Sequence, residues 1–151
     1  MLKEGDKAPD FKLTADDDSV VSLKDFKGKT VVLYFYPKDN TSGCTKEASG
    51  FKDALDAFEE KDTVILGVSK DSVKSHKKFK EKLELPFLLL SDEELNVCNA
   101  YDVWKEKTVC GRTSMGIERS TFVIDPKGKI KKIFPKVKVT GHVEDVLKEI
   151  E

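Results

Sequence analysis

Residues 31–44, VVLYFYPKDNTSGC, decide the fold, because a short apolar run meets a polar loop that ends in a cysteine. The first six residues are all apolar, with β-branched and aromatic side chains that are typical of a strand buried on both faces. Pro37 ends the run because it has no backbone N–H to donate. Turn-forming residues follow, namely Asp39, Asn40, Ser42 and Gly43. The stretch therefore predicts a central buried strand that leads into a loop.

Residues 45–58, TKEASGFKDALDAF, follow this loop and predict an amphipathic helix. Their apolar positions recur three and four residues apart as one stripe, made of Ala48, Phe51, Leu55 and Phe58. Cys44 is thus expected at or within the first helical turn, where backbone N–H groups and the helix dipole favour negative charge. The thiolate is the nucleophilic form of cysteine, so this position favours a reactive thiol. A buried cysteine that only fills space is the alternative.

Two neighbours of Cys44 favour the reactive interpretation. Thr41 lies three residues before the cysteine and can point its hydroxyl at the same place, and Pro37 stiffens the loop that carries both. The pattern Pro37-x-x-x-Thr41-x-x-Cys44 resembles the active-site motif of the peroxiredoxins. Residues 5–11, GDKAPDF, and 22–29, SLKDFKGK, also resemble the opening of peroxiredoxin chains.

The arginines supply a second indication. Nearly all of the 27 basic residues are lysines, and the two arginines are Arg112 and Arg119. An arginine in such a background is a candidate for a place that needs a planar, permanently charged fork. Arg119 is the better candidate, because it opens the apolar run RSTFVI and a residue at a strand end can reach a site at the sheet edge. In MGIERSTFVID, residues 115–125, it stands where peroxiredoxins have their active-site arginine.

The resemblance covers nearly the whole chain and is strongest to the bacterioferritin-comigratory, or PrxQ, branch in residues 35–48, 101–104 and 115–125. It implies a thioredoxin-like fold and reduction of hydrogen peroxide and organic hydroperoxides by a peroxidatic cysteine, here Cys44. It carries over further site residues, namely Pro37, Thr41 and Arg119, with Glu47 as a partner of the arginine. The implied reductant is a thioredoxin-like protein or a small thiol. The resemblance implies no metal, no bound cofactor and a monomeric protein.

The thiol that resolves the sulfenic acid on Cys44 is a separate question. Many members of the branch have a resolving cysteine five residues beyond the peroxidatic one, where this chain has Ser49. Cys98 falls in a short predicted helix that would have to move or unwind to reach Cys44. Cys110 falls in a predicted loop nine residues before Arg119, and loops open more easily than packed helices. We therefore expect an external thiol first, Cys110 next, and Cys98 as a buried filler.

The rest of the chain alternates between predicted strands and helices. Strands are predicted at 63–69, 86–91, 119–125 and 129–134, and helices at 71–83, 92–101 and 142–150. Residues 5–13 and 20–29 predict an N-terminal β-hairpin, and residues 102–116 have no sustained period and predict a loop. The second helix is expected to start with Asp71 as its cap and to carry His76, which is expected to be structural although it could act as a base. The fold class is α/β, a central mixed β-sheet flanked by helices in a single domain spanning residues 1–151.

Composition excludes several function classes. The 27 basic and 28 acidic residues nearly cancel, so neither nucleic acid nor an anionic membrane is an expected partner. The sequence has neither a signal peptide nor a membrane-spanning run, which favours the cytoplasm. Three cysteines without C-x-x-C spacing argue against a disulfide framework and a zinc site.

Two alternatives from other classes remain. A thiol-disulfide oxidoreductase would normally have a second cysteine at the position of Glu47, three residues after Cys44. A non-catalytic binding module on the same fold would be supported by a Cys44 that is buried and inert.

Overall fold

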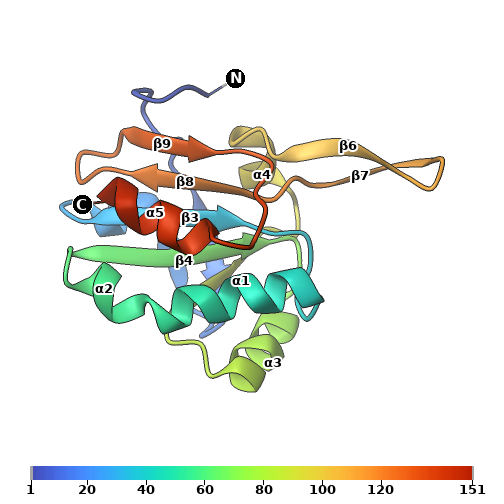
Figure 1. Cartoon of the computed structure of the whole chain (residues 1–151), viewed down its shortest axis with the longest axis horizontal. Coiled ribbons are helices and arrows are strands. Elements are labelled where there is room, and N and C mark those ends of the chain that lie inside the picture. Colours follow the sequence, from blue (N-terminus) through green and yellow to red (C-terminus); the bar gives the residue numbers. More distant parts are fainter. Residues whose placement is uncertain (1, 151) are drawn as a thin grey trace.

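The computed structural model describes residues 2–150, apart from the side chain of Val109. A seven-stranded mixed sheet with the order β2-β1-β5-β4-β3-β8-β9 forms its centre (Figure 1). The strands of this sheet are β1 (Lys12–Ala15), β2 (Val20–Ser22), β3 (Thr30–Phe35), β4 (Thr63–Ser69), β5 (Leu88–Ser91), β8 (Ser120–Ile124) and β9 (Ile130–Phe134). The helices are η1 (Leu23–Phe26), α1 (Ser42–Asp53), α2 (Leu55–Glu59), α3 (Val73–Leu83), α4 (Asn96–Ala100) and α5 (His142–Ile150). The predicted α/β fold with a mixed sheet and flanking helices is confirmed.

Strand β3, the predicted central strand, lies between β4 and β8. It runs parallel to β4 and antiparallel to β8, with Phe35 opposite Ser120. Arg119 is the residue just before β8, so this register places it at the end of β3, where the chain enters the loop toward Cys44. Strand pairing thus brings together Cys44 and Arg119, which are 75 residues apart in sequence.

The sheet separates two apolar cores, because alternate residues of β3 point to opposite faces. Leu33 and its alternating neighbours pack on one face with η1, α4 and the N-terminal segment. Tyr34 and its alternating neighbours pack on the other face with α1, α2, α3 and α5. Cys44 belongs to the second core and Cys98 to the first. The two buried thiols therefore lie on opposite faces of the sheet.

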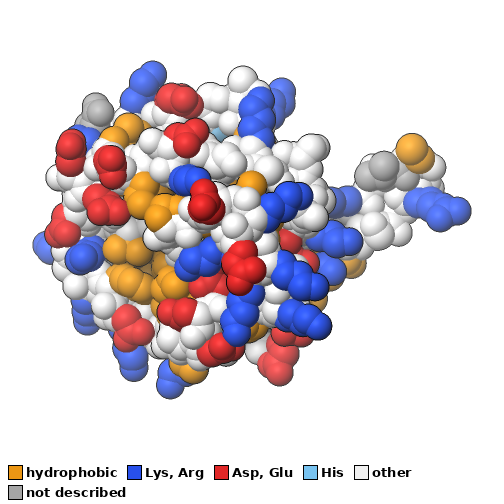
Figure 2. All heavy atoms as spheres, turned by 90° about the horizontal axis from the view of Figure 1, so that it is seen from below, with side chains coloured by type: hydrophobic (Ala, Val, Ile, Leu, Met, Phe, Trp, Pro, Cys, Tyr) orange, Lys and Arg blue, Asp and Glu red, His pale blue; other side chains and the backbone are white. Residues whose placement is uncertain are grey.

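Residues 102–116 are not a loop, as the sequence suggested, but mostly a β-hairpin. Strands β6 (Trp104–Val109) and β7 (Arg112–Ile117) pair antiparallel and form a second, two-stranded sheet. Cys110 and Gly111 make the turn, both with positive φ, as a two-residue type I′ turn requires. The prediction was wrong because most of these side chains are polar and at least partly exposed, so no apolar alternation marks the strands. The tip of the hairpin projects from the body of the molecule (Figures 1 and 2).

Three smaller boundaries also differ from the prediction. The N-terminal hairpin is confirmed, but its strands are the short β1 and β2, and the residues after them form the 3₁₀ helix η1. The predicted helix 45–58 is broken at Ala54 into α1 and α2, while Phe51 and Phe58 both remain buried. Ser72, not Asp71, caps α3, because its hydroxyl accepts the N–H of Ser75 at 3.1 Å.

The face in Figure 2 shows lysine and arginine side chains interspersed with aspartate and glutamate. Over residues 2–150, the helices are all too short or too polar to cross a membrane.

Candidate active site

Helix α1 presents Cys44 in its first turn, as the sequence predicted. The helix begins at Ser42, and the extended Thr41 before it is the N-cap residue, whose carbonyl oxygen accepts the N–H of Thr45 at 2.9 Å. Cys44 is the third helical residue, so its own N–H is one of the first-turn donors without an intrahelical partner. These N–H groups and the helix dipole favour a negative charge at this end of the helix.

Arg119 contacts the sulfur of Cys44 directly. Its Nη2 donates to Sγ at 3.3 Å, and its Nη1 donates to Oε1 of Glu47 at 2.7 Å. The fork of the guanidinium thus joins a thiol to a carboxylate that lies one helical turn further along α1. Cys44 is only 1% exposed, but its sulfur faces a cation and not only apolar neighbours. Burial alone therefore does not make it an inert filler.

Gly43 packs closely against the guanidinium of Arg119, a contact that the sequence did not indicate. A Cβ added to Gly43 would lie 3.1 Å from Nη2 of Arg119, tighter than ordinary packing allows. The sequence marked Gly43 only as a turn former, and the structure places it inside the helix with the guanidinium against it. A clue was its position directly before the candidate cysteine.

Charge at the site is governed by burial and by the ion pair between Glu47 and Arg119. Burial raises the pKa of Glu47 to about 7, against the opposing effect of Arg119. Burial also works against the charge of Arg119, but Glu47 and Cys44 outweigh it, so the pKa of the guanidinium is raised. The difference follows from exposure, because the side chain of Glu47 is fully buried whereas that of Arg119 is 16% exposed. Within the described part of the chain, Oε2 of Glu47 has no hydrogen-bond partner.

Thr41 and Pro37 lie in the loop that precedes α1. The hydroxyl of Thr41 is exposed and donates to the carbonyl oxygen of Lys38 at 3.0 Å. Pro37 is half-buried. It follows Tyr36, whose backbone N–H donates to the carbonyl oxygen of Val68. Both residues thus lie in the loop before Cys44, and the hydroxyl of Thr41 is hydrogen-bonded within that loop.

The other two cysteines are far from this arrangement in the fold. Cys98 is fully buried in α4 on the opposite face of the sheet, and burial raises the pKa of its thiol, as does its contact with Asp92. Cys110 is exposed at the tip of the β6–β7 hairpin. Ser49 is half-buried on α1. None of the three cysteines is in a disulfide.

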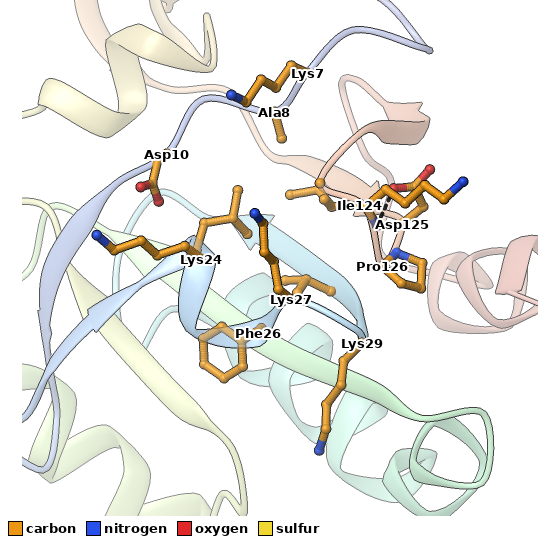
Figure 3. Close-up of a pocket in the computed structure, with 14 residues that line it drawn as sticks. Lys7, Ala8, Asp10, Lys24, Phe26, Lys27, Lys29, Ile124, Asp125 and Pro126 are labelled. Carbon is orange, nitrogen blue, oxygen red and sulfur yellow. Dashed lines mark hydrogen bonds between the residues drawn. The ribbon is translucent and has the colours of Figure 1, made fainter.

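A separate pocket lies at the opposite end of β3. Apolar residues, among them Leu23, Phe26 and Ile124, line it together with several lysines (Figure 3). Val31, near the start of β3, also lines it, whereas the loop to Cys44 leaves from the other end of the strand. Among the described residues that line this pocket there is no cysteine. It is not the place where Cys44 would react.

Comparison with known proteins shows the family of this chain. Residues 4–133 match the model of the AhpC/TSA family. The chain belongs to this family. It is 54% identical to the peroxiredoxin Bcp of Bacillus subtilis, over 99% of this chain and 96% of that protein. It is 44% identical to the peroxiredoxin Bcp of Escherichia coli K12, over 97% and 94% of the two chains.

Solved structures agree with this assignment. A cysteine-to-serine mutant of PrxQ from Xylella fastidiosa superposes with a TM-score of 0.94 at 41% identity, over 99% of this chain and 96% of that one. The bacterioferritin comigratory protein of Xanthomonas campestris gives a TM-score of 0.89 at 42% identity, over 93% and 89%. The chain is therefore a peroxiredoxin of the Bcp, or PrxQ, branch, with the thioredoxin-like fold and a thiol-dependent peroxidase activity. Neither alternative class is favoured.

The raised pKa of Glu47 predicts how stability depends on pH. Because the folded state holds a proton on Glu47 up to about pH 7, against 4.5 for an ordinary glutamate, it binds more protons than the unfolded chain between these values. The contribution of Glu47 to the free energy of unfolding therefore falls as pH rises from about 4.5 to about 7 and is constant above. At about 1.4 kcal/mol per pKa unit, it falls by at most roughly 3 kcal/mol.

Urea denaturation of the wild-type chain and Glu47→Gln at pH 5, 6, 7 and 8 measures this contribution. The variant should have a flatter curve, and the surface variant Glu60→Gln should follow the wild type. Parallel curves for Glu47→Gln and the wild type would contradict the prediction.

Proposed function

We propose that Cys44 is the peroxidatic thiol and that it reduces hydrogen peroxide and organic hydroperoxides. The observation that carries the proposal is the 3.3 Å contact between Nη2 of Arg119 and Sγ of Cys44. A guanidinium at this distance stabilises the thiolate, which is the attacking species. The relative from Xanthomonas campestris is described by its alkyl peroxide reduction activity, which supports organic hydroperoxides as substrates here.

The reaction follows from this geometry. The thiolate attacks the terminal oxygen of the hydroperoxide, the S–O bond forms as the O–O bond breaks, and the electron pair leaves on the departing alkoxide or hydroxide. That oxygen takes a proton and departs as an alcohol or water, and Cys44 becomes a sulfenic acid. Arg119 offsets the negative charge that moves from sulfur to oxygen, so its interaction is strongest where charge develops.

The loop before α1 orients the substrate. The hydroxyl of Thr41 donates its hydrogen to the carbonyl oxygen of Lys38. The lone pairs of the Thr41 oxygen can therefore accept a hydrogen bond from the O–H group of a hydroperoxide. The first-turn N–H groups of α1 are donors for a peroxide oxygen. Pro37 restricts the backbone of the loop that holds Thr41. Glu47 keeps Arg119 in place through its 2.7 Å bond to Nη1, so its role is to position the guanidinium.

The peroxidase assay of Cys44→Ser tests the proposal. The variant should consume no peroxide above the uncatalysed rate, because a hydroxyl is a far weaker nucleophile than a thiolate. Circular dichroism should show an unchanged fold. Cys110→Ser, assayed with an external thiol in excess, should keep the wild-type rate. Substantial activity in Cys44→Ser would rule out this mechanism.

Arg119→Lys separates the shape of the arginine from its charge. Lysine supplies a positive charge but cannot donate to Cys44 and Glu47 at the same time through a planar fork. The second-order rate constant for peroxide should fall by roughly 10²- to 10³-fold, as when one preorganised donor to a transition state is lost. Stopped-flow measurement of Cys44 oxidation gives this constant, and a near-normal value would mean that a point charge suffices.

We further propose that an external thiol resolves the sulfenic acid. Ser49 cannot form a disulfide, Cys98 lies on the far face of the sheet, and Cys110 is carried away from the body by the β6–β7 hairpin. An incoming thiol condenses with the sulfenic acid: an S–S bond forms, the S–O bond breaks, and the hydroxyl leaves as water. The mixed disulfide left on Cys44 is then reduced by a second thiol through thiol–disulfide exchange. A thioredoxin-like protein or a small thiol fits this role. Cys110 remains the next candidate for the resolving thiol, and Cys98 only fills space in the core.

Oxidation with one equivalent of peroxide, followed by non-reducing peptide mass spectrometry, tests this order. Without added thiol, Cys44 should remain as a sulfenic or sulfinic acid. A dominant bridge between Cys44 and Cys98 would refute the order, and a bridge to Cys110 within one chain would promote that residue to the main resolving thiol.

Several broader properties complete the proposal. Residues 1–151 act as one catalytic domain and as a monomer, with no nucleic acid or membrane partner, in line with the balanced charge. A reducing cytoplasm fits three unpaired thiols, one of them exposed. No metal or cofactor takes part in the thiol chemistry.

A further inference from the structure

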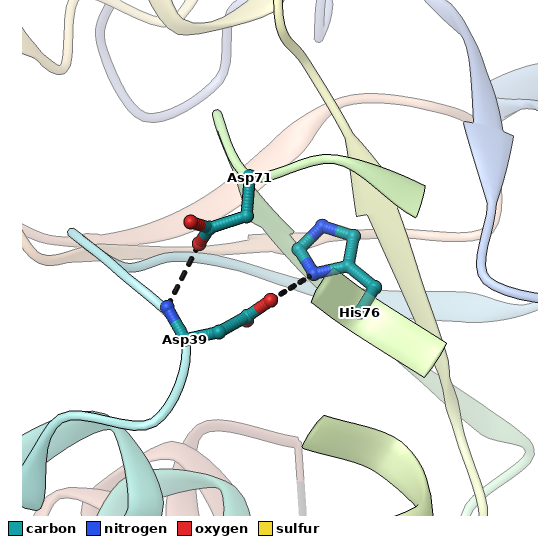
Figure 4. Close-up of side chains that lie close together, drawn as sticks. All are labelled: Asp39, Asp71 and His76. Atoms are coloured by element: carbon teal, nitrogen blue, oxygen red, sulfur yellow. Dashed lines mark hydrogen bonds and ion pairs between the residues drawn. The ribbon is translucent and has the colours of Figure 1, made fainter. Parts of the chain in front are cut away.

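A buried polar cluster lies beneath the loop that leads to Cys44. Asp39, in the middle of that loop, and His76, in the first turns of α3, are both almost fully buried. Oδ2 of Asp39 lies 2.7 Å from Nδ1 of His76, and the backbone N–H of Asp39 donates to Oδ2 of Asp71 at 2.8 Å (Figure 4). From the sequence alone, Asp39 is expected to be a turn former and His76 a structural residue with no evident partner.

The contacts of His76 place a proton between it and Asp39. Nε2 lies 3.0 Å from the carbonyl oxygen of Leu90, which only accepts hydrogen bonds, so Nε2 carries a hydrogen. Nδ1 faces a carboxylate oxygen at 2.7 Å, and two lone pairs would repel at that distance. One proton therefore lies in the Nδ1–Oδ2 contact, and the pair is joined by a charge-assisted hydrogen bond.

The same contacts argue against a metal ion in this cluster, although the three side chains are ordinary metal ligands. Asp39 already accepts from the hydroxyls of Tyr36 at 2.6 Å and Ser75 at 2.8 Å, besides His76. Asp71 accepts from the hydroxyl of Ser69 and the N–H of Asp39. A cation would have to displace donors that satisfy these carboxylates.

What the cluster does is dock the loop on α3. The carboxylate of Asp39 receives one donor from Tyr36, the residue directly after β3, and two from α3, Ser75 and His76. The start of α3 also favours a negative charge through its dipole. Asp39 lies between Pro37 and Thr41 and five residues before Cys44. The side chain of Asp39 thus connects the loop before α1 to α3.

Cys44 and Arg119 reach each other from separate segments, α1 and the start of β8. Their alignment therefore depends on the positions of both segments. Glu47, which is also on α1, holds Arg119 against this helix, and Asp39 holds the loop that leads to the N-cap Thr41. We infer that the hydrogen-bonded pair Asp39 and His76 is a positioning pair for peroxide reduction, which sets the reactivity of Cys44 through the loop.

Variants of His76 separate its two hydrogen bonds. Asparagine can place its amide nitrogen near the position of Nδ1 and keep a donor to Asp39, whereas glutamine reaches toward Leu90 and leaves Asp39 without that donor. Both lose one partner and bury a neutral amide, so both should lose stability. Only His76→Gln and Asp39→Asn should lower the rate constant of Cys44 oxidation strongly, by about 10- to 100-fold, as small misplacements of reacting groups do. His76→Asn should stay within about threefold of the wild type.

The rate constant is measured in a single turnover with one equivalent of peroxide, quenched with a thiol-blocking reagent and read from the Cys44 peptide by mass spectrometry. Urea denaturation first establishes conditions in which each variant is folded. Ser75→Ala removes one donor from the rim of the cluster, should fold normally, and should lower the rate severalfold. Asp16→Asn is the matched control, because Asp16 is also a buried carboxylate tied to α3, through Lys80 at 3.2 Å, but it lies in the N-terminal hairpin. It should lose stability without losing rate.

Equal rates for His76→Asn and His76→Gln would overturn the inference, as would wild-type rates for folded Asp39→Asn and Ser75→Ala. A loss of rate in Asp16→Asn equal to that in Asp39→Asn would reduce the pair to an ordinary structural contact. The inference rests on Cys44 as the reacting thiol, which the peroxide consumption of the wild-type chain and of Cys44→Ser decides separately. Failure of the positioning role and failure of the proposed function therefore give different results.

Discussion

The contact of one guanidinium with a buried thiol and a buried carboxylate is the constraint on which the rest of this structure depends. Burial of three ionisable groups together is costly unless each has a partner of opposite charge. Arg119 supplies that partner to both Cys44 and Glu47, which are themselves one helical turn apart. Cys44 can therefore sit in the core, away from bulk water, and still face a positive charge.

Strand pairing makes this contact possible. The antiparallel register of β3 with β8 brings the start of β8 beside the point where the chain leaves β3 for α1. Gly43 has no Cβ, which leaves room for the guanidinium to pack closely against the first turn of α1. The sheet also keeps the remaining buried thiol, Cys98, on its other face, so the strand arrangement that builds the site also isolates it from a partner within the core.

Two buried carboxylates hold the segments around Cys44. Glu47 fixes Arg119, and the cluster around Asp39 fixes the loop that carries Thr41 into α1. The two carboxylates differ in their hydrogen-bond partners. The carboxylate of Asp39 accepts hydrogen bonds from three side chains. One oxygen of Glu47 accepts a hydrogen bond from Arg119, and the other has no partner among residues 2–150. The incomplete partnering of Glu47 is consistent with its pKa near 7.

The sequence by itself determined the central strand, the helix that starts near Cys44, and the candidate residues Pro37, Thr41 and Cys44, because these depend on neighbours in the chain. Local rules of turn chemistry, apolar spacing and helix termini are sufficient for such features. Arg119 also stood out, because a rare arginine at the start of an apolar run is visible without any fold. Its contact with Cys44 could be hypothesised through family resemblance but not worked out from local pattern.

Only the tertiary structure decided what depends on distant segments. The β6–β7 hairpin was missed because its strands bury no continuous apolar face and so leave no period in the sequence. The roles of Gly43, Asp39 and His76 were missed for a related reason, since each is defined by a partner from another element, Arg119 for the glycine and α3 or the loop for the other two. Side-chain contacts across a sheet or between a loop and a helix are set by packing, so local sequence patterns do not identify the partners.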